Sequence, residues 1–453
     1  MKVLPTPSST SVSSTSTQPL PRYRAYTDKH FDKIEALQHL SEEQRFEMKV
    51  VSSVLPFRVN EFVIDTLIDW SNIPVDPIFQ LTFPQRGMLS NEHYKQVALA
   101  LRNGDRLEIR DAVRKVRAAL NPHPAGQLEF NLPSHGNAQL DGVQHKYDQT
   151  VLFFPSQGQT CHAYCTFCFR WAQFIGDNDL RIAGRETTRL VEYLRDHPRV
   201  SDVLFTGGDP MVMRTRNIRA YIEPLLELDS VKTIRIGTKA LTYWPQRFVT
   251  DEDADDLLRL FEEIVASGKH LALMAHYNHW QELEPSISRQ AIARVRKSGA
   301  QIRAQGPLLQ HINDDPAVWA RLWQTQVELG IVPYYFFVER DTGARRYFEV
   351  PLVRAWEIYR DAAQQVSGLA RTVRGPSMSA HPGKVEIQGV ATIRGEKVFV
   401  LRFLQARKAE WTYRPFFAKF DPKATWFDQL VPAFGEREFF FEAELAAMEA
   451  SVA

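Results

Sequence analysis

Cysteine is nearly absent from this 453-residue chain. Its three cysteines, Cys161, Cys165 and Cys168, are too few and too close together for the disulfide framework of a secreted domain. Long apolar runs are missing too, since none approaches the roughly 18 residues that span a bilayer. The N-terminus also lacks the apolar core of a secretory signal. We therefore predict a cytoplasmic protein without a membrane partner.

An excess of charge of one sign is also missing. The 55 Lys and Arg residues are balanced by 54 Asp and Glu residues, for a net charge of +1. A balanced chain offers no general attraction to a polyanion, so we expect no nucleic-acid partner. The first 22 residues are rich in Ser, Thr and Pro, which predicts a disordered tail over residues 1–22.

The chain changes pattern near residue 146. Residues 23–145 carry apolar residues at three- and four-residue spacing, which predicts a helical N-terminal domain. Within it, the proline-rich stretch 74–89 is expected to be an irregular surface connector. Residues 146–370 alternate six short apolar runs with longer amphipathic segments, which predicts six strand–helix units. Residues 371–453 read as mixed strands and loops that end in a short acidic helix.

Repeated strand–helix units imply parallel strands with an active face at their carboxyl ends. Six units are fewer than the eight of a complete barrel. We therefore predict an α/β fold built on an open, partial (β/α)6 barrel, which the C-terminal region 371–453 would help to close. An open, doubly wound sheet is the alternative.

The three cysteines directly follow the first strand of this region. Thiolates are ligands for soft metals, and three of them on one loop can hold a four-iron cluster while leaving one iron free for substrate or cofactor. The alternative is a zinc site that adds His162 as the fourth ligand. A zinc-stabilised binding protein is therefore one candidate function.

The spacing C-x3-C-x2-C, with the aromatic Phe167 before the last cysteine, resembles the radical S-adenosylmethionine (radical SAM) superfamily. The segments CFRW, DVLFTGGDPMVM, IRIGTKALTYWPQR, HYNHW, AQGPLLQHINDD and PYYFFVERDTG resemble the lysine 2,3-aminomutase family, from about residue 50 to residue 390. That resemblance implies a [4Fe-4S] cluster, S-adenosylmethionine, pyridoxal 5′-phosphate and an amino acid substrate. It also implies an electron donor such as flavodoxin or ferredoxin, and a homo-oligomer. Members of the family move an amino group from Cα to Cβ.

The resemblance assigns five residues to S-adenosylmethionine. Gly207, Gly208 and Asp209 match the turn that meets the methionine amino group, where glycines allow a close backbone approach. His276 and Asn278 match positions near the adenosine end. All five follow predicted strands, so we expect them at one edge of the sheet.

Four more residues match positions for pyridoxal phosphate and substrate. Lys384 corresponds to the lysine that bonds the cofactor aldehyde, Tyr147 to a residue that packs on the pyridoxal ring, and Gln305 to a phosphate contact. Arg170 corresponds to the arginine that holds the substrate carboxylate, a role that suits a planar guanidinium. Lys384 and Arg170 are thus the expected catalytic pair.

The chain departs from the lysine enzymes where the far ammonium group of lysine would bind. Two family aspartates align here with Arg340, which Asp341 follows, and with Ser377. Because an arginine repels an ammonium group and attracts a carboxylate, lysine is a poor expected substrate, and glutamate or another acidic or polar amino acid is a better one. A related enzyme that diverts the substrate radical to decarboxylation or deamination is a further alternative.

Overall fold

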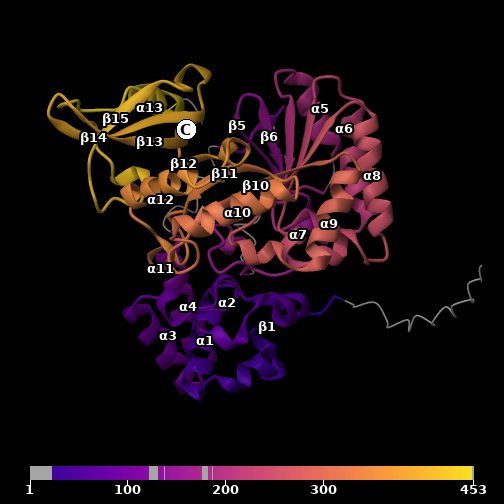
Figure 1. The fold of residues 1–453 in the computed structure, drawn as a ribbon, viewed down its shortest axis with the longest axis vertical. Coiled ribbons are helices and arrows are strands. Elements are labelled where there is room, and N and C mark those ends of the chain that lie inside the picture. The colour runs from indigo at the N-terminus through magenta and orange to yellow at the C-terminus, as the bar shows by residue number, and fades with distance from the viewer. Residues whose placement is uncertain (1–22, 122–130, 137, 176–181, 186, 451–453) are drawn as a thin grey trace, which may run out of the picture.

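The computed structural model of the protein describes residues 23–121, 131–136, 138–175, 182–185 and 187–450. The predicted tail, residues 1–22, lies outside these ranges. Figure 1 shows a group of N-terminal helices, a large sheet covered by helices, and C-terminal strands at one end of that sheet. In the described ranges, no helix is both long enough and apolar enough to cross a membrane.

The N-terminal region is mainly helical, as predicted. Two helices replace the single long amphipathic segment 91–120, because Gly104 ends the first with a φ of 76° and Asp105 caps the second. The elements are β1 (Ala25–Thr27), α1 (Glu42–Val54), β2 (Arg58–Asn60), α2 (Pro77–Thr82), α3 (Asn91–Asn103) and α4 (Arg106–Leu120).

The prediction of a surface connector over residues 74–89 was wrong. Its centre forms the buried helix α2, in which Ile78 and Leu81 are fully buried. Pro77 does not break this helix because it occupies the first helical turn, where proline is tolerated. The Asp76 carboxylate accepts a hydrogen bond from the Phe79 backbone N–H at 2.7 Å and caps the helix.

The large sheet contains all six predicted strands in parallel, followed by a seventh. These strands are β6 (Thr150–Phe153), β7 (Asp202–Phe205), β8 (Thr233–Thr238), β9 (His270–His276), β10 (Gln301–Leu308), β11 (Val332–Val338) and β12 (Arg374–Ser379). The intervening helices are α5 (Thr188–Asp196), α6 (Thr215–Leu226), α7 (Ala240–Tyr243), α8 (Ala254–Ala266), α9 (Ser286–Lys297), α10 (Pro316–Glu328), α11 (Arg345–Phe348) and α12 (Leu352–Gln364).

The strand order follows the chain without reversal, from β5 (Val143–Tyr147) at one edge to β15 (Pro415–Lys419) at the other. A doubly wound sheet reverses its order at a switch point, so that alternative is wrong. β5 pairs antiparallel with β6, and it lies in the range that the pattern assigned to the helical domain. A separate small hairpin joins β3 (Ser134–His135) and β4 (Ala138–Gln139).

The C-terminal region extends the sheet at its β12 edge. β13 (Gly383–Ile393), β14 (Glu396–Ala406) and β15 are antiparallel additions, and α13 (Glu442–Ala450) is the expected short acidic helix. Side chains link this region to the opposite edge of the sheet. Lys146 Nζ at the end of β5 donates to Ala380 O at 2.5 Å, and Arg407 donates to Asn131 Oδ1 at 2.9 Å.

The two faces of the sheet differ in chemistry because side chains alternate along each strand. Val203, Ile234 and Ile302 belong to the apolar core beneath the covering helices. Their neighbours point to the opposite face, called the inner face below. The inner face carries Asp202, Arg235, Arg303, Gln305, Tyr335, Arg374 and Lys384. Polar side chains gathered on one face of a sheet favour a binding site on that face.

Candidate active site

The cysteine loop follows β6 and is held by the N-terminal region. Thr166 donates its backbone N–H to Leu81 O at 2.9 Å and its hydroxyl to Gln80 O at 2.7 Å, both in α2. Asn60 Nδ2, at the end of β2, donates to His162 O at 3.2 Å. Phe167 of the loop belongs to the apolar core of the N-terminal helices. The misread segment 74–89 is therefore part of what shapes the loop.

The three cysteines are each half-buried in the same loop. Burial raises the pKa of Cys165 to about 11, that of Cys168 to about 12, and that of Cys161 well above its usual range, with the neighbouring cysteines adding to the rise for Cys161 and Cys168. Thiolates in such a site need a cationic partner, and soft thiolate donors suit iron. The loop therefore fits an iron–sulfur cluster.

The zinc alternative requires the His162 ring as a fourth ligand beside the three cysteines. Among the described residues, no three His, Cys, Asp or Glu side chains are grouped as ligands of a single ion, which applies to a zinc site and to a cluster site alike. The His162 ring instead stacks on Trp244, with centroids 6.4 Å apart, and meets the edge of Tyr23. Its contacts are those of a packed aromatic ring.

The glycine turn after β7 packs on the chain just before Cys161. A Cβ on Gly208 would lie 2.4 Å from Thr160 N, so this position has no room for a side chain, while Gly207 adopts a φ of 137° that favours glycine. Asp209 N donates to Thr160 O at 2.7 Å. The turn and the cysteine loop thus form one unit; the role of the turn toward methionine stays a prediction.

The Asp209 carboxylate is used within the fold. It accepts hydrogen bonds from Thr238 Oγ1 at 2.7 Å, from Lys239 N at 2.8 Å and from Met211 N at 2.9 Å. Because these donors come from both the β7 turn and the end of β8, Asp209 joins the ends of these two neighbouring strands.

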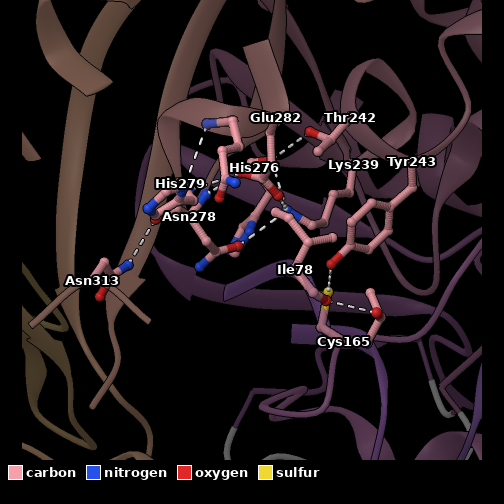
Figure 2. Close-up of polar contacts among 12 residues, drawn as sticks. Ile78, Cys165, Lys239, Thr242, Tyr243, His276, Asn278, His279, Glu282 and Asn313 are labelled. Carbon is pink, nitrogen blue, oxygen red and sulfur yellow. Dashed lines mark hydrogen bonds and ion pairs between the residues drawn. The ribbon is translucent and has the colours of Figure 1, made fainter. Parts of the chain in front are cut away.

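A buried ion pair lies beside the cysteine loop, as Figure 2 shows. Lys239 Nζ contacts Glu282 Oε1 at 2.6 Å, and the Glu282 side chain is fully buried. The same ammonium donates to Asn278 Oδ1 at 3.0 Å and lies 4.5 Å from the ring centroid of Tyr243, whose hydroxyl accepts from the Cys165 thiol at 3.8 Å. Sequence reasoning missed this network, although a lysine at the carboxyl end of a parallel strand was a usable signal.

Glu282→Gln is expected to destabilise the protein strongly. The change leaves the Lys239 ammonium buried without its counter-charge, which typically costs about 3–5 kcal/mol. The exposed pair between Arg219 and Glu263 gives the matched control, since breaking a surface pair costs at most about 1 kcal/mol. Urea denaturation of Glu282→Gln and Glu263→Gln measures both; equal midpoints would show that the buried pair is not structural.

His276 and Asn278 come together over the cysteine loop. The His276 ring stacks on Phe167 at 5.7 Å between centroids, and burial lowers its pKa to about 3, so the imidazole is neutral. His276 Nδ1 and Asn278 Nδ2 are buried and have no hydrogen-bond partner among the described residues. Two buried polar atoms left open at the mouth of the sheet are suited to a bound polar ligand. Their role toward adenosine stays a prediction.

Arg170 and Arg340 flank one aromatic ring. The Arg170 guanidinium carbon lies 5.1 Å from the ring centroid of Phe169, and that of Arg340 lies 5.5 Å from it. Arg170 Nη1 and Arg340 Nε are buried without hydrogen-bond partners among the described residues. Burial lowers the pKa of Arg170 to about 10, which still leaves it charged at neutral pH. The Asp341 carboxylate forms an ion pair with Arg340, with Oδ1 3.6 Å from Nε.

Ser377, which aligns with the second family aspartate, lies within the sheet, and its role toward the substrate stays a prediction. It is fully buried on β12, and its hydroxyl donates to Phe336 O in the neighbouring strand at 3.5 Å. This hydrogen bond connects Ser377 to the backbone of the neighbouring strand. Phe169, which the sequence did not single out, is 40% exposed, and its ring lies near both guanidinium groups.

Lys384, Tyr147 and Gln305 gather around Tyr335. Lys384 Nζ lies 3.9 Å from the Tyr335 ring centroid and donates to Gln405 Oε1 at 3.4 Å. Gln305 is the register partner of Tyr335 on β10. Tyr147 ends β5, where the adjacent Lys146 bond to Ala380 holds the turn before Lys384. Tyr335 is thus a central residue that sequence reasoning missed.

Lys384 is chemically unusual. Burial, followed by the charges of Arg235 and Arg374, lowers its pKa to about 7. About half of such an amine is uncharged at neutral pH and can attack a carbonyl carbon. The donor set therefore fits a carbonyl cofactor that bonds to an amine.

A loop of three half-buried cysteines after the first parallel strand is the arrangement of radical SAM enzymes. No family model matches the chain. A protein of Aquifex aeolicus (strain VF5) named "Putative L-lysine 2,3-aminomutase" is 31% identical over 409 residues, which cover 90% of this chain and 96% of that protein. The L-lysine 2,3-aminomutase of Acetoanaerobium sticklandii is 28% identical over 261 residues, which cover 57% of this chain and 60% of that protein. The chain belongs to the lysine 2,3-aminomutase family of radical SAM enzymes.

Among solved structures, SuiB of Streptococcus suis bound to S-adenosylmethionine is similar over 57% of this chain and 53% of its own. The TM-score is 0.34 and the sequence identity is 17%. An overlap of this size adds nothing to the assignment, which depends on the sequence relatives.

Proposed function

We propose that this protein is a pyridoxal-phosphate-dependent amino acid 2,3-aminomutase whose substrate is acidic or polar rather than lysine. We further infer that the six predicted parallel strands, β6 to β11, form a partial (β/α)6 barrel, with the site at the carboxyl ends of the strands. The unreversed strand order and the polar inner face support this arrangement. A homo-oligomer and an electron donor such as flavodoxin or ferredoxin complete the proposal.

In this proposal Cys161, Cys165 and Cys168 hold a [4Fe-4S] cluster, and His276 and Asn278 contact S-adenosylmethionine beside it. When bound, the cluster and S-adenosylmethionine supply a hydrogen-abstracting radical, and pyridoxal phosphate supplies a conjugated ring that eases the movement of nitrogen. The Phe167 ring stacks on the His276 ring, and this stacking excludes water from between the two rings.

The observation that carries the substrate proposal is the pair of guanidinium groups around Phe169. Arg170 is placed to hold the α-carboxylate, and its open Nη1 is a donor for one carboxylate oxygen. Arg340, whose Nε lies 3.6 Å from the Asp341 carboxylate, then presents its guanidinium to the far end of the substrate. Two cations at a small site favour a substrate with two acidic or polar ends and repel the second ammonium group of lysine.

The proposal is tested by anaerobic incubation of reconstituted protein with S-adenosylmethionine, dithionite and a pool of amino acids. We expect mass spectrometry to find a β-amino acid isomer of glutamate or of another polar amino acid, while lysine remains unchanged. Loss of carbon dioxide or ammonia would instead favour diversion of the substrate radical. Formation of 5′-deoxyadenosine without any change in an amino acid would refute the mutase proposal.

The attachment of pyridoxal phosphate to Lys384 should depend on pH around neutrality. The lowered pKa of about 7 means that the amine is protonated below pH 7 and free above it, so the attachment rate should rise through pH 7 and level off by about pH 8. Borohydride reduction followed by peptide mapping measures the labelled fraction. An exposed lysine, with an ordinary pKa near 10.4, would instead show labelling that still rises above pH 9.

A further inference from the structure

Three arginines lie on the same inner face of the sheet as Lys384. Arg235 lies on β8, Arg303 on β10 and Arg374 on β12. Arg235 donates to Asp202 Oδ1 at 2.8 Å, so its charge is partly balanced. Arg303 and Arg374 have no acidic partner among the residues that the structure describes. The inner face therefore carries an excess of positive charge that the protein itself leaves uncompensated.

Arg303 and Arg374 are instead held by aromatic rings. The Arg374 guanidinium carbon lies 4.2 Å from the ring centroid of Tyr334 and 4.3 Å from that of Tyr335. Arg303 lies 5.4 Å from the Tyr334 centroid. Stacking fixes the plane of a guanidinium and leaves its N–H groups directed outward from the edge. Both arginines are thus oriented as donors around one pair of tyrosines.

Arg374 has a donor that the fold does not use. Its Nη2 is buried and has no hydrogen-bond partner in the described ranges. A buried charged donor without an acceptor is costly, so such a group in a native site calls for a ligand that completes it. An anion placed between Arg374 and Arg303 would satisfy the open N–H and balance the charge.

Arg374 and Lys384 meet at the same ring. Lys384 Nζ lies 3.9 Å from the Tyr335 centroid, and the Arg374 guanidinium carbon lies 4.3 Å from it. A ligand that engages both must therefore carry an amine-reactive carbonyl and an anionic group a short distance apart. Pyridoxal phosphate bears its aldehyde and its phosphomethyl group on neighbouring ring carbons, which is this spacing of functions.

We propose that Arg374, assisted by Arg303 and Arg235, forms the phosphate subsite for a carbonyl-bearing phosphate monoester whose aldehyde reaches Lys384. The inference rests on the proposed function, because pyridoxal phosphate is the ligand of that class the protein would use. A phosphate dianion matches the planar fork of a guanidinium and offsets the excess positive charge. Gln305, the register partner of Tyr335, then lies next to the arginines and supplements them.

The test compares pyridoxal phosphate with pyridoxal, which has the same aldehyde and no phosphate. Binding of each to the anaerobically purified full chain is followed by absorbance. For Arg374→Gln we expect pyridoxal phosphate to bind about 10- to 100-fold more weakly, as expected for loss of a charge-assisted hydrogen bond, with pyridoxal binding unchanged. Inorganic phosphate should compete with pyridoxal phosphate in the wild-type protein and far less in the variant.

Arg360→Gln is the matched control, since Arg360 also stacks on an aromatic ring, 4.8 Å from the Trp356 centroid, but belongs to the covering helix α12. It should bind both compounds like the wild type. Arg303→Gln provides a second subsite variant with the same expected selectivity and a smaller loss, in case Arg374→Gln fails to fold.

The outcomes separate this inference from the function beneath it. If Arg374→Gln weakens pyridoxal and pyridoxal phosphate equally, Arg374 acts on Lys384 alone and the subsite is refuted. If the wild-type protein binds the two compounds equally well, the subsite is refuted while the cofactor assignment survives. If the wild-type protein binds neither at Lys384, the proposed function fails together with the subsite.

Discussion

Replacing Cys168 with alanine is expected to abolish the production of 5′-deoxyadenosine. Three thiolates on one loop are the fewest that hold a four-iron cluster with one iron left open, so two thiolates leave the cluster incompletely ligated. The cysteines are also the only ones in the chain, and no other thiol can replace the missing ligand. Iron analysis and electron paramagnetic resonance of the anaerobically reconstituted protein measure the loss. We expect at least about a 1,000-fold drop in turnover.

His162→Gln is the informative companion to that change. In the zinc alternative His162 is a metal ligand, and its replacement would release the metal as Cys168→Ala does. In the proposed cluster site the His162 ring is not a ligand; it packs against Trp244 and Tyr23, and its buried Nδ1 has no hydrogen-bond partner among the described residues. The protein should then keep its full iron content after His162→Gln. Zinc in the wild-type protein, lost in both variants, would contradict the cluster assignment.

The sequence was sufficient for the parallel strands because each is a local signal. The apolar run 271–277, for example, is bounded by helical segments. The local pattern alone predicts that its alternate residues Leu271 and Leu273 are buried against helices. Consecutive parallel strands joined by a helix usually lie side by side, and the strand order follows the chain in this way. His276, for example, ends strand β9, as its position after the apolar run predicts.

Contacts between distant segments were beyond the sequence pattern. Helix α2 contacts the cysteine loop through the hydrogen bond from Thr166 N to Leu81 O. No local feature of residues 74–89 indicated that partner. The proline content of that stretch favoured a connector. Pro77 is compatible with a helix because it lies in the first turn, and this is visible only once Asp76 is known to cap the helix. Tertiary packing decided the outcome at that segment.

The charge environment of the site was also visible only in three dimensions. The alignment singled out Arg340 and Arg170 separately, whereas the structure brings both to the ring of Phe169. Arg374 and Lys384 are close along the chain, but their common contact with Tyr335 depends on the register between β11 and β12. Pairings of this kind arise from strand register, which a single sequence does not specify.

Lys384→Ala is expected to remove mutase turnover, by at least about 1,000-fold, while leaving iron content unchanged. Lys384 lies on β13 against Tyr335 and Gln405, and the cysteine loop is built by β6 and the N-terminal region, so the two sites have separate supports. The variant should still produce 5′-deoxyadenosine slowly when reduced, because that step needs only the cluster and S-adenosylmethionine. Amino acid analysis and iron content are measured on the same sample.

Lys408→Ala is the control for this change, since Lys408 is an exposed lysine just past β14 that pairs with Glu444. It should retain turnover and covalent cofactor. An active Lys384→Ala protein with a full cluster would show that the nitrogen moves without a lysine-bound cofactor, and the function would then have to be assigned from Arg170 and Arg340 alone. An inactive variant that also loses iron would mean that the two sites are coupled through the sheet. Lys384 and the cysteines are held by different parts of the structure. We therefore expect Lys384→Ala to lose nitrogen transfer while radical generation stays intact.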